Sequence, residues 1–104
     1  MTYIRVSTMT PQAGREEEVG QLLVDLYSTQ EGCLSISFVK AADTSGEQGR
    51  ISFWISERAA DEAATQERSL YLRSRLHLQI QRGHQERSFM VAAATSDVQV
   101  GSAI

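Results

Sequence analysis

The side chains best suited to acid–base, nucleophilic or metal chemistry are few and scattered along this chain. The two histidines, His77 and His84, lie seven residues apart, which matches no common metal-ligand spacing. Cys33 is the only cysteine, so it cannot form a disulfide within the chain, and no motif marks it as a nucleophile. The sequence therefore predicts no metal site. His77 is expected to be an ordinary side chain on a solvated helix face, unless a substrate is bound beside it.

Trp54 is the residue most able to shape a binding site. It is the only tryptophan, and it lies in the alternating segment RISFWIS, residues 50–56. An indole buries a large apolar area and keeps one N–H donor. It serves either as a core residue or as a flat wall against a planar ligand, and the residues alone leave both roles open.

Composition and charge narrow the class of protein. The 104 residues fit one domain, expected at 1–95 with a C-terminal tail at 96–104. The net charge is −3 and the arginines are scattered, which argues against nucleic acid, because phosphate binding needs a basic surface. We find no signal-peptide pattern and no apolar run of the ~20 residues that span a bilayer. The sequence predicts a soluble, cytoplasmic protein without a membrane partner.

The elements that would position these residues follow from periodicity. Alternating apolar and polar residues predict strands at 2–10, 33–41, 50–56 and 87–95. Helical spacing predicts a first helix at 15–32, with its buried face at Val19, Leu22, Leu23, Leu26 and Tyr27. An Ala-rich, charged segment predicts a second helix at 56–69, with Ser56 as its N-cap. Gly32 and Gly83 are expected as helix C-caps.

Residues 70–81 fit two descriptions. Their apolar and polar residues alternate, which is typical of a strand. Leucine, arginine and glutamine are good helix formers, however, and β-branched residues are nearly absent, which favours a helix. We expect a helix here and keep the strand as the alternative.

The order of elements predicts an α+β, ferredoxin-like βαββαβ fold, with a four-stranded antiparallel sheet and helices on one face. The helices are expected on the more apolar strand face, which carries Ile4, Val6, Leu34, Ile36, Phe38, Ile51, Phe53, Ile55, Phe89 and Val91. The other face mixes polar residues such as Arg5 and Ser52 with Trp54 and Met90. We expect that mixed face to pack against a second copy, which predicts a homodimer.

Three segments resemble the antibiotic biosynthesis monooxygenase (ABM) family. PQAGREEEVGQLL is similar to its turn and acidic first helix, EGCLSISFVKA to the strand that follows, and RISFWISERAADEA to a strand ending in tryptophan before an alanine-bearing helix. The similarity runs over about residues 2–95. It implies a dimeric α+β barrel. Members of the family include cofactor-free oxygenases of aromatic phenols, quinol monooxygenases and haem-degrading enzymes.

The resemblance also implies roles for particular residues. In the phenol-oxidising branch the anion of the substrate reacts with oxygen, so no cofactor is expected. Trp54 matches that branch's pocket tryptophan, and Arg73 falls near its pocket arginine, which could stabilise an anion. The expected pocket tyrosine falls at Ala60, however, and the chain contains no asparagine. The haem-degrading branch uses asparagine and a second tryptophan, so this chain departs from it.

Three functions follow as hypotheses, of which the third is a pure dimerisation module. The first is a cofactor-independent monooxygenase of an aromatic phenol or quinol-like substrate, with molecular oxygen as co-substrate. Arg73 would hold the anion, Trp54 would stack on the ring, and His77 or Tyr71 would accept the proton. The second is a non-catalytic, dimeric ligand-binding or sensing domain of the same fold, because fold does not determine function. By strict alternation Trp54 should face the second subunit, unless a bulge turns it beneath the helices.

Overall fold

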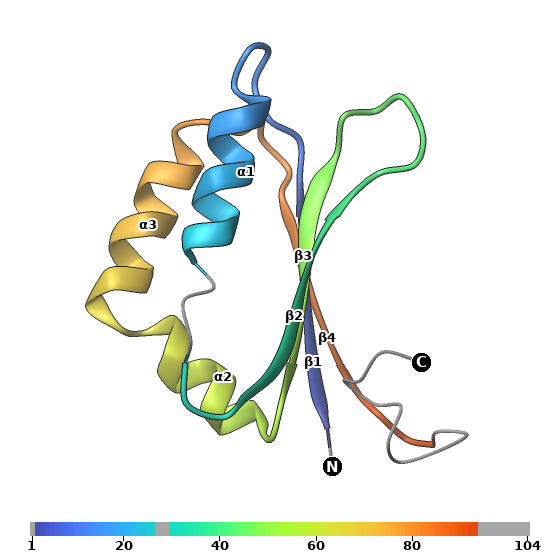
Figure 1. The fold of residues 1–104 in the computed structure, drawn as a ribbon, viewed down its shortest axis with the longest axis vertical. Coiled ribbons are helices and arrows are strands. Elements are labelled where there is room, and N and C mark those ends of the chain that lie inside the picture. Colours follow the sequence, from blue (N-terminus) through green and yellow to red (C-terminus); the bar gives the residue numbers. More distant parts are fainter. Residues whose placement is uncertain (1, 27–29, 94–104) are drawn as a thin grey trace.

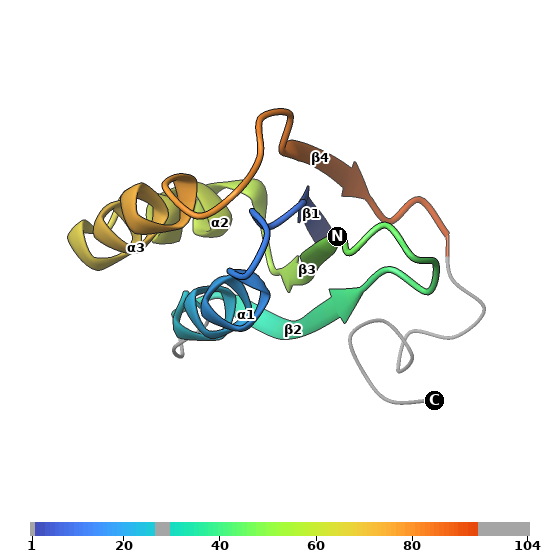
Figure 2. The ribbon, with the colours of Figure 1, turned by 90° about the horizontal axis from the view of Figure 1, so that it is seen from above.

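Four antiparallel strands form one layer, and three helices cover one of its faces (Figures 1 and 2). The computed structural model describes residues 2–26 and 30–93. In chain order the elements are β1 (Tyr3–Met9), α1 (Glu16–Asp25), β2 (Cys33–Lys40), β3 (Gln48–Trp54), α2 (Glu57–Ala64), α3 (Glu67–His77) and β4 (Gln85–Met90). The sheet order β2-β3-β1-β4 is the ferredoxin-like α+β topology predicted from the sequence.

Some expectations fall outside the described residues. They are the burial of Tyr27, the end of the expected last strand at residues 94 and 95, and the tail at 96–104. Among the residues that are described, no helix is long and apolar enough to cross a membrane. The cytoplasmic location stays a prediction.

The second helical region is divided, which the sequence did not indicate. The helix expected at 56–69 ends with α2, and α3 begins after two intervening residues. The Ser69 hydroxyl donates to the Ala63 carbonyl at 2.9 Å across this break. The helix expected at 70–81 is confirmed as far as His77, and the strand alternative is wrong. Leu72 and Leu76 are buried on one side of α3.

The helix caps are partly as expected. Ser56 is the N-cap of α2, because its hydroxyl accepts a hydrogen bond from the Ala59 N–H at 3.1 Å. Gly32 and Gly83 are not C-caps: α1 is capped by Leu26 and α3 by Leu78, several residues earlier. Both glycines instead take positive φ in the turns that lead into β2 and β4.

The assignment of the two sheet faces was wrong. The helices cover the mixed face, where Tyr3, Met9 and Trp54 are buried. The face expected to be covered carries Ile4 and Phe53, which are opposite each other in register and only partly buried. Strand β2 is an exception, because two residues of the expected face are covered by the helices. A bulge between Cys33 and Ser35 shifts its alternation, so that Ile36 and Phe38 do face the helices.

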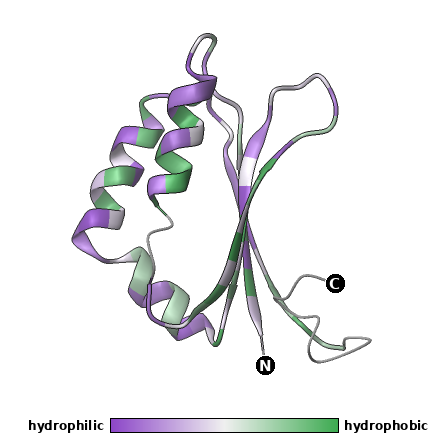
Figure 3. Cartoon of the chain, viewed as in Figure 1, coloured by the Kyte–Doolittle hydropathy of each residue, from purple (hydrophilic) through white to green (hydrophobic). Residues whose placement is uncertain are grey.

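The helix-facing core consists of two separate clusters. One packs α1 and α3 against the sheet and contains Met9, Val19, Leu22, Leu23, Leu26, Leu72, Leu76 and Ile80, with Phe38 beside it. The other packs α2 on Tyr3 and Trp54 through Ala60 and Ala63. Hydrophobic positions run along the strands as well as α1 and α3 (Figure 3). The two clusters lie toward opposite ends of the strands, and polar side chains occupy the middle of this face.

Candidate active site

A row of polar side chains crosses the sheet between the two core clusters. In β1 and β3, Arg5 is opposite Ser52 and Ser7 is opposite Arg50, all on the helix-facing side. Ser7 and Ser52 are fully buried. Buried polar groups in the centre of a small core cost free energy unless they are hydrogen-bonded. Hydrogen bonds to Glu86 and to the Arg5 carbonyl offset that cost for Ser7 and Ser52, so the centre of this face is a satisfied polar region beneath the helices.

Trp54 forms one end of this polar region. It is 6 % exposed, and its Nε1 donates to the Ser52 hydroxyl at 2.8 Å. Ser52 in turn donates to the Arg5 carbonyl at 3.3 Å. Because the indole N–H is already satisfied, the face of the ring is what Trp54 can offer a ligand. Trp54 reaches the helix side without a bulge in β3, because the helices lie on the face that alternation gives it.

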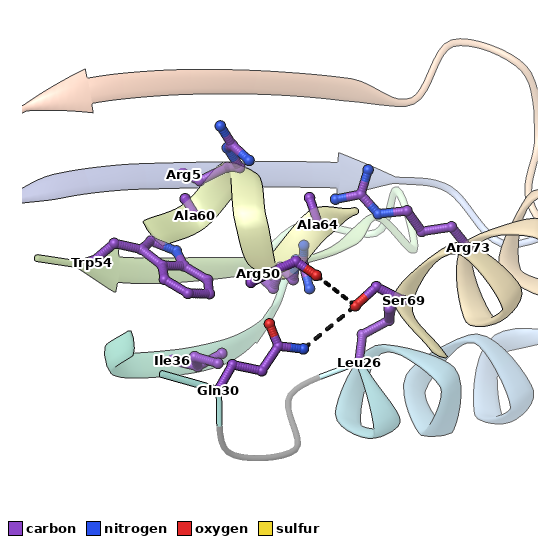
Figure 4. A pocket seen from close by; sticks show the side chains of 11 residues that line it. Arg5, Leu26, Gln30, Ile36, Arg50, Trp54, Ala60, Ala64, Ser69 and Arg73 are labelled. Atoms are coloured by element: carbon purple, nitrogen blue, oxygen red, sulfur yellow. Dashed lines mark hydrogen bonds between the residues drawn. The ribbon is translucent and has the colours of Figure 1, made fainter. Parts of the chain in front are cut away.

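A cavity of about 20 Å³ lies beside the indole. Trp54 and Ala60 line it near α2, and Arg73 extends toward it from α3 (Figure 4). Three alanines of α2, Ala60, Ala63 and Ala64, form much of its roof. Ala60 stands where the family resemblance led us to expect a tyrosine. The small side chains leave the indole face accessible from the cavity.

Arg73 is the cation that the sequence comparison singled out. Its Nη2 lies 3.9 Å from the Glu86 carboxylate, which also accepts a hydrogen bond from Ser7 at 3.2 Å. Burial lowers the pKa of Arg73, and the negative charge of Glu86 opposes that effect. The positive charges of Arg50 and Arg5 lower the pKa further. A guanidinium remains protonated under all these influences, so Arg73 is a fixed, partly desolvated positive charge.

Arg5 ties α2 to the sheet beside the same cavity. Its Nη2 donates to the Tyr3 hydroxyl and to Asp61 of α2, both at 2.9 Å. The Tyr3 hydroxyl then donates to Ser88 of β4 at 2.8 Å. Burial alone would lower the pKa of Arg5, but the hydrogen bonds to Asp61 and Tyr3 outweigh it and the pKa is raised. Arg5 is therefore held in place from three elements.

A second cavity of about 60 Å³ lies on the other side of Arg73. Its lining includes Ser7, His77, His84 and Glu86, and it shares Leu26, Arg50 and Arg73 with the first cavity. The rings of His77 and His84 meet edge to face, with centroids 4.7 Å apart. The two cavities are thus neighbours, and the Arg73 side chain is part of the wall between them.

The structure brings together three of the four residues singled out from the sequence. Trp54 and Arg73 line the first cavity, and Arg73 and His77 line the second. Tyr71 lies outside both, exposed on α3 with the Arg75 guanidinium 6.0 Å from its ring centroid. Sequence reasoning missed Arg5 and Arg50. The available signal was the presence of arginines on a strand face that was otherwise too apolar to be solvated.

Metal ligands do not gather in the part of the chain that the structure describes, where no group of three or more His, Cys, Asp or Glu residues could hold an ion. Cys33 is half-buried, and burial raises the pKa of its thiol, which makes it a poorer nucleophile. The arrangement places an indole and a partly desolvated positive charge on one small cavity.

Comparisons with known proteins agree with this architecture. The sequence model described as antibiotic biosynthesis monooxygenase matches residues 2–69. No curated protein matches the chain in sequence. Among solved structures, Rv0793 from Mycobacterium tuberculosis superposes with a TM-score of 0.82 at 18% identity, covering 92% of this chain and 100% of the other. A conserved protein from Methanosarcina mazei Go1 superposes with a TM-score of 0.79 at 12% identity, covering 86% of this chain and 91% of the other.

A third structure is a mutant of SnoaB, described as a cofactor-independent oxygenase from Streptomyces nogalater. It superposes with a TM-score of 0.76 at 16% identity, covering 90% of this chain and 96% of the other. At such identities these three likenesses establish the fold alone.

Proposed function

Because the chain belongs to the antibiotic biosynthesis monooxygenase family, we propose that it is a cofactor-independent monooxygenase of an aromatic phenol or quinol-like molecule. The observation that carries the proposal is that Trp54 and Arg73 line one cavity between the sheet and the helices. An indole face suits a planar ring, and a partly desolvated guanidinium suits the anion made from it.

The reaction needs no electron donor other than the substrate. A phenol and O₂ give a quinone and water: one oxygen atom enters the ring, the other leaves as water, and the substrate supplies all four electrons. The first requirement is a phenolate, because the anion gives an electron to oxygen far more readily than the neutral phenol. The protein then has to bind the ring, accept a proton and stabilise negative charge.

Each of these tasks has a candidate among the described residues. Trp54 binds the ring, and Arg73 stabilises the phenolate and the peroxide formed from it. His77 is the candidate proton acceptor, because it lines the second cavity together with Arg73 and histidine is the side chain that most often serves as a general base. Tyr71 lies outside both cavities, so the proposal gives it no part in proton transfer.

The cavities must enlarge before a substrate can enter. They measure about 20 and 60 Å³, whereas pockets for small organic ligands measure roughly 300–1,000 Å³. Of the three residues that border both cavities, Arg73 is the partly exposed one that lies on a helix and not within the sheet or the buried core, so its side chain is the one we expect to move. Its movement would join the two spaces into one. Closure around the ring would then exclude water from the anion.

Oxygen uptake with anthrone tests the proposal, because anthrone and O₂ give anthraquinone and water. We expect turnover by the wild type above the uncatalysed rate, and a loss of about 100-fold or more in Arg73→Gln, as for other groups that stabilise a transition-state anion. Trp54→Ala should raise KM more than it lowers kcat. Arg58→Gln is the matched control, because Arg58 is an exposed arginine that, among the described residues, pairs with Glu62 one helical turn away. Turnover that survives both site changes would exclude this site.

The same experiment separates catalysis from binding alone. A dimeric ligand-binding or sensing domain is the second candidate, favoured by Ala60 in place of a pocket tyrosine. Its expected result is quenching of Trp54 fluorescence by anthraquinone without any oxygen uptake from anthrone. Trp54 is the only tryptophan, so the emission reports this one position.

We also propose that the protein is a homodimer that packs sheet against sheet. The uncovered face carries Ile4, Val6, Ile51, Phe53 and Phe89, all partly or largely exposed. Such a patch is typical of an interface. Light scattering should give twice the chain mass of 11.5 kDa. Phe53→Arg should give a monomer, whereas Leu70→Arg, an exposed position on α3, should leave the dimer intact. A monomeric wild type would contradict the proposal.

A further inference from the structure

Three arginines, not one, line the cavity beside Trp54. Arg5 and Arg50 come from adjacent strands and are diagonal neighbours on the sheet, because Arg5 is opposite Ser52 and Arg50 is opposite Ser7. Arg73 reaches the same cavity from α3. Figure 4 shows Trp54 at one end, Arg73 at the other and Arg50 between them. A single phenolate needs only one of these cations.

Concentrating three guanidinium groups beneath the helices costs free energy. Each stays protonated, so the charges repel one another in a partly desolvated region. At Arg73 burial lowers the pKa most, the charge of Glu86 opposes this, and the charges of Arg50 and Arg5 lower the pKa further, whereas the pKa of Arg5 is raised by its own hydrogen bonds. Asp61, the carboxylate paired with Arg5, is 60% exposed and therefore well screened by solvent. A second anion bound in the cavity would relieve the repulsion.

Arg5 and Arg50 both border the cavity from neighbouring strands. Both hydrogen bonds of Arg5 to Tyr3 and Asp61 come from a single nitrogen, Nη2. Its guanidinium fork is thus anchored at one end. Arg50 lies next to it on the sheet, at the middle of the cavity. Guanidinium groups pair best with carboxylates, whose two oxygens match the planar fork.

We propose that the ligand of this site is an aromatic carboxylate, whose carboxyl group binds Arg50 and Arg5 while its ring lies against Trp54. Its phenolic oxygen then faces Arg73. This inference rests on the proposed function for the identity of the phenol, and it adds the substrate class: a phenol or quinol bearing a carboxylate on the ring system. The residues that select this class are Arg5, for which the family resemblance implied no role, and Arg50, which lies near the position where the resemblance implied a pocket asparagine.

Matched probes test the proposal by calorimetry at pH 7. 1-Naphthol and 1-hydroxy-2-naphthoate share the ring and the phenolic oxygen and differ in the carboxylate. We expect the carboxylated probe to bind about ten-fold tighter or more, in line with a charge-assisted hydrogen bond. Arg50→Gln should abolish that preference, and Arg50→Lys, which keeps the charge but loses the fork, should retain part of it. Arg58→Gln should keep it in full.

Several outcomes would overturn the inference. Equal affinity for the two probes in the wild type would do so, as would a preference that Arg50→Gln leaves unchanged in a variant whose circular dichroism is native. Inorganic phosphate could also displace 1-hydroxy-2-naphthoate as effectively as another aromatic carboxylate does. That result would overturn the inference, because the site would then bind any small anion.

The test separates this inference from the proposed function. If 1-hydroxy-2-naphthoate is preferred through Arg50 but anthrone is not oxidised, the carboxylate site stands and the monooxygenase proposal fails. If anthrone is oxidised through Arg73 but the carboxylated probe has no advantage, the monooxygenase proposal stands and the carboxylate site fails.

Discussion

The hydrogen bond between Trp54 and Ser52 should be measurable as stability. Ser52 is 1% exposed, accepts from the indole N–H at 2.8 Å and donates to the Arg5 carbonyl at 3.3 Å. Ser52→Ala leaves a buried N–H without a partner, which costs about 2 kcal/mol. For a domain of this size that corresponds to a fall in Tm of roughly 10 °C.

A double-mutant cycle isolates the interaction. Trp54→Phe removes the donor, so in that background Ser52→Ala should cost only about 1 kcal/mol, from the lost bond to Arg5. Urea unfolding followed by circular dichroism suits all four proteins, because it does not depend on Trp54 fluorescence. Ser74→Ala is the control: Ser74 is an exposed helix serine bonded to the Tyr71 carbonyl, and its loss should change stability by less than about 0.5 kcal/mol.

If Ser52→Ala lowers the free energy of unfolding equally in the wild type and in Trp54→Phe, the reasoning is refuted. That result would mean that the indole N–H finds another partner, and that Ser52 does not orient the ring. If the coupling is found, the same variant should also weaken anthraquinone quenching of Trp54 fluorescence, because a ring that can tilt offers a poorer stacking surface.

Three further predictions concern the elements around the site. Gly32→Ala should destabilise the fold by at least about 1 kcal/mol more than Gly46→Ala. Both glycines have positive φ, but a Cβ at Gly32 would lie 2.6 Å from that of Ala59, whereas Gly46 faces open space. Equal midpoints of urea unfolding for the two variants would contradict this prediction. Ser56→Ala removes the N-cap of α2 and should cost about 1 kcal/mol in urea unfolding; an unchanged midpoint would show that the cap is not needed. Burial raises the pKa of Cys33 above its usual 9.0, so the folded state holds the thiol proton more tightly, and stability should fall as pH rises past that value. Between pH 8 and pH 10 the free energy of unfolding should fall less in Cys33→Ser than in the wild type. An identical fall in both proteins would refute the raised pKa of Cys33.

Local patterns predicted the elements well, because they depend on short-range spacing. The acidic first turn at Glu16, Glu17 and Glu18 and the 3–4 spacing of leucines define α1. Helix propensity correctly predicted a helix at residues 70–77, although their alternation of apolar and polar residues is typical of a strand. The same reasoning placed helix ends at Gly32 and Gly83, too late in both cases. Both glycines do take left-handed conformations, but in turns beyond the helices.

The choice of the buried sheet face could not be made by counting apolar side chains. The covered face of β1 and β3 carries two arginines and two buried serines beside Tyr3, Met9 and Trp54, whereas the uncovered face is the more apolar one. Local rules fail at a site when polar groups are buried for a ligand and stabilised by contacts elsewhere. Here the hydrophobic contacts of the helices lie at the two ends of the sheet, in separate clusters.

The sequence by itself determined the kind of elements, their order and hence the ferredoxin-like α+β fold, because each depends on neighbours within a few residues. It also singled out Trp54 and Arg73 through a family resemblance. Only the tertiary structure decided that the helices cover the arginine-bearing face, since that choice depends on contacts between separate elements, such as Arg5 of β1 with Asp61 of α2, which lie 56 positions apart. The same contacts place Arg5, Arg50 and Arg73 around one cavity.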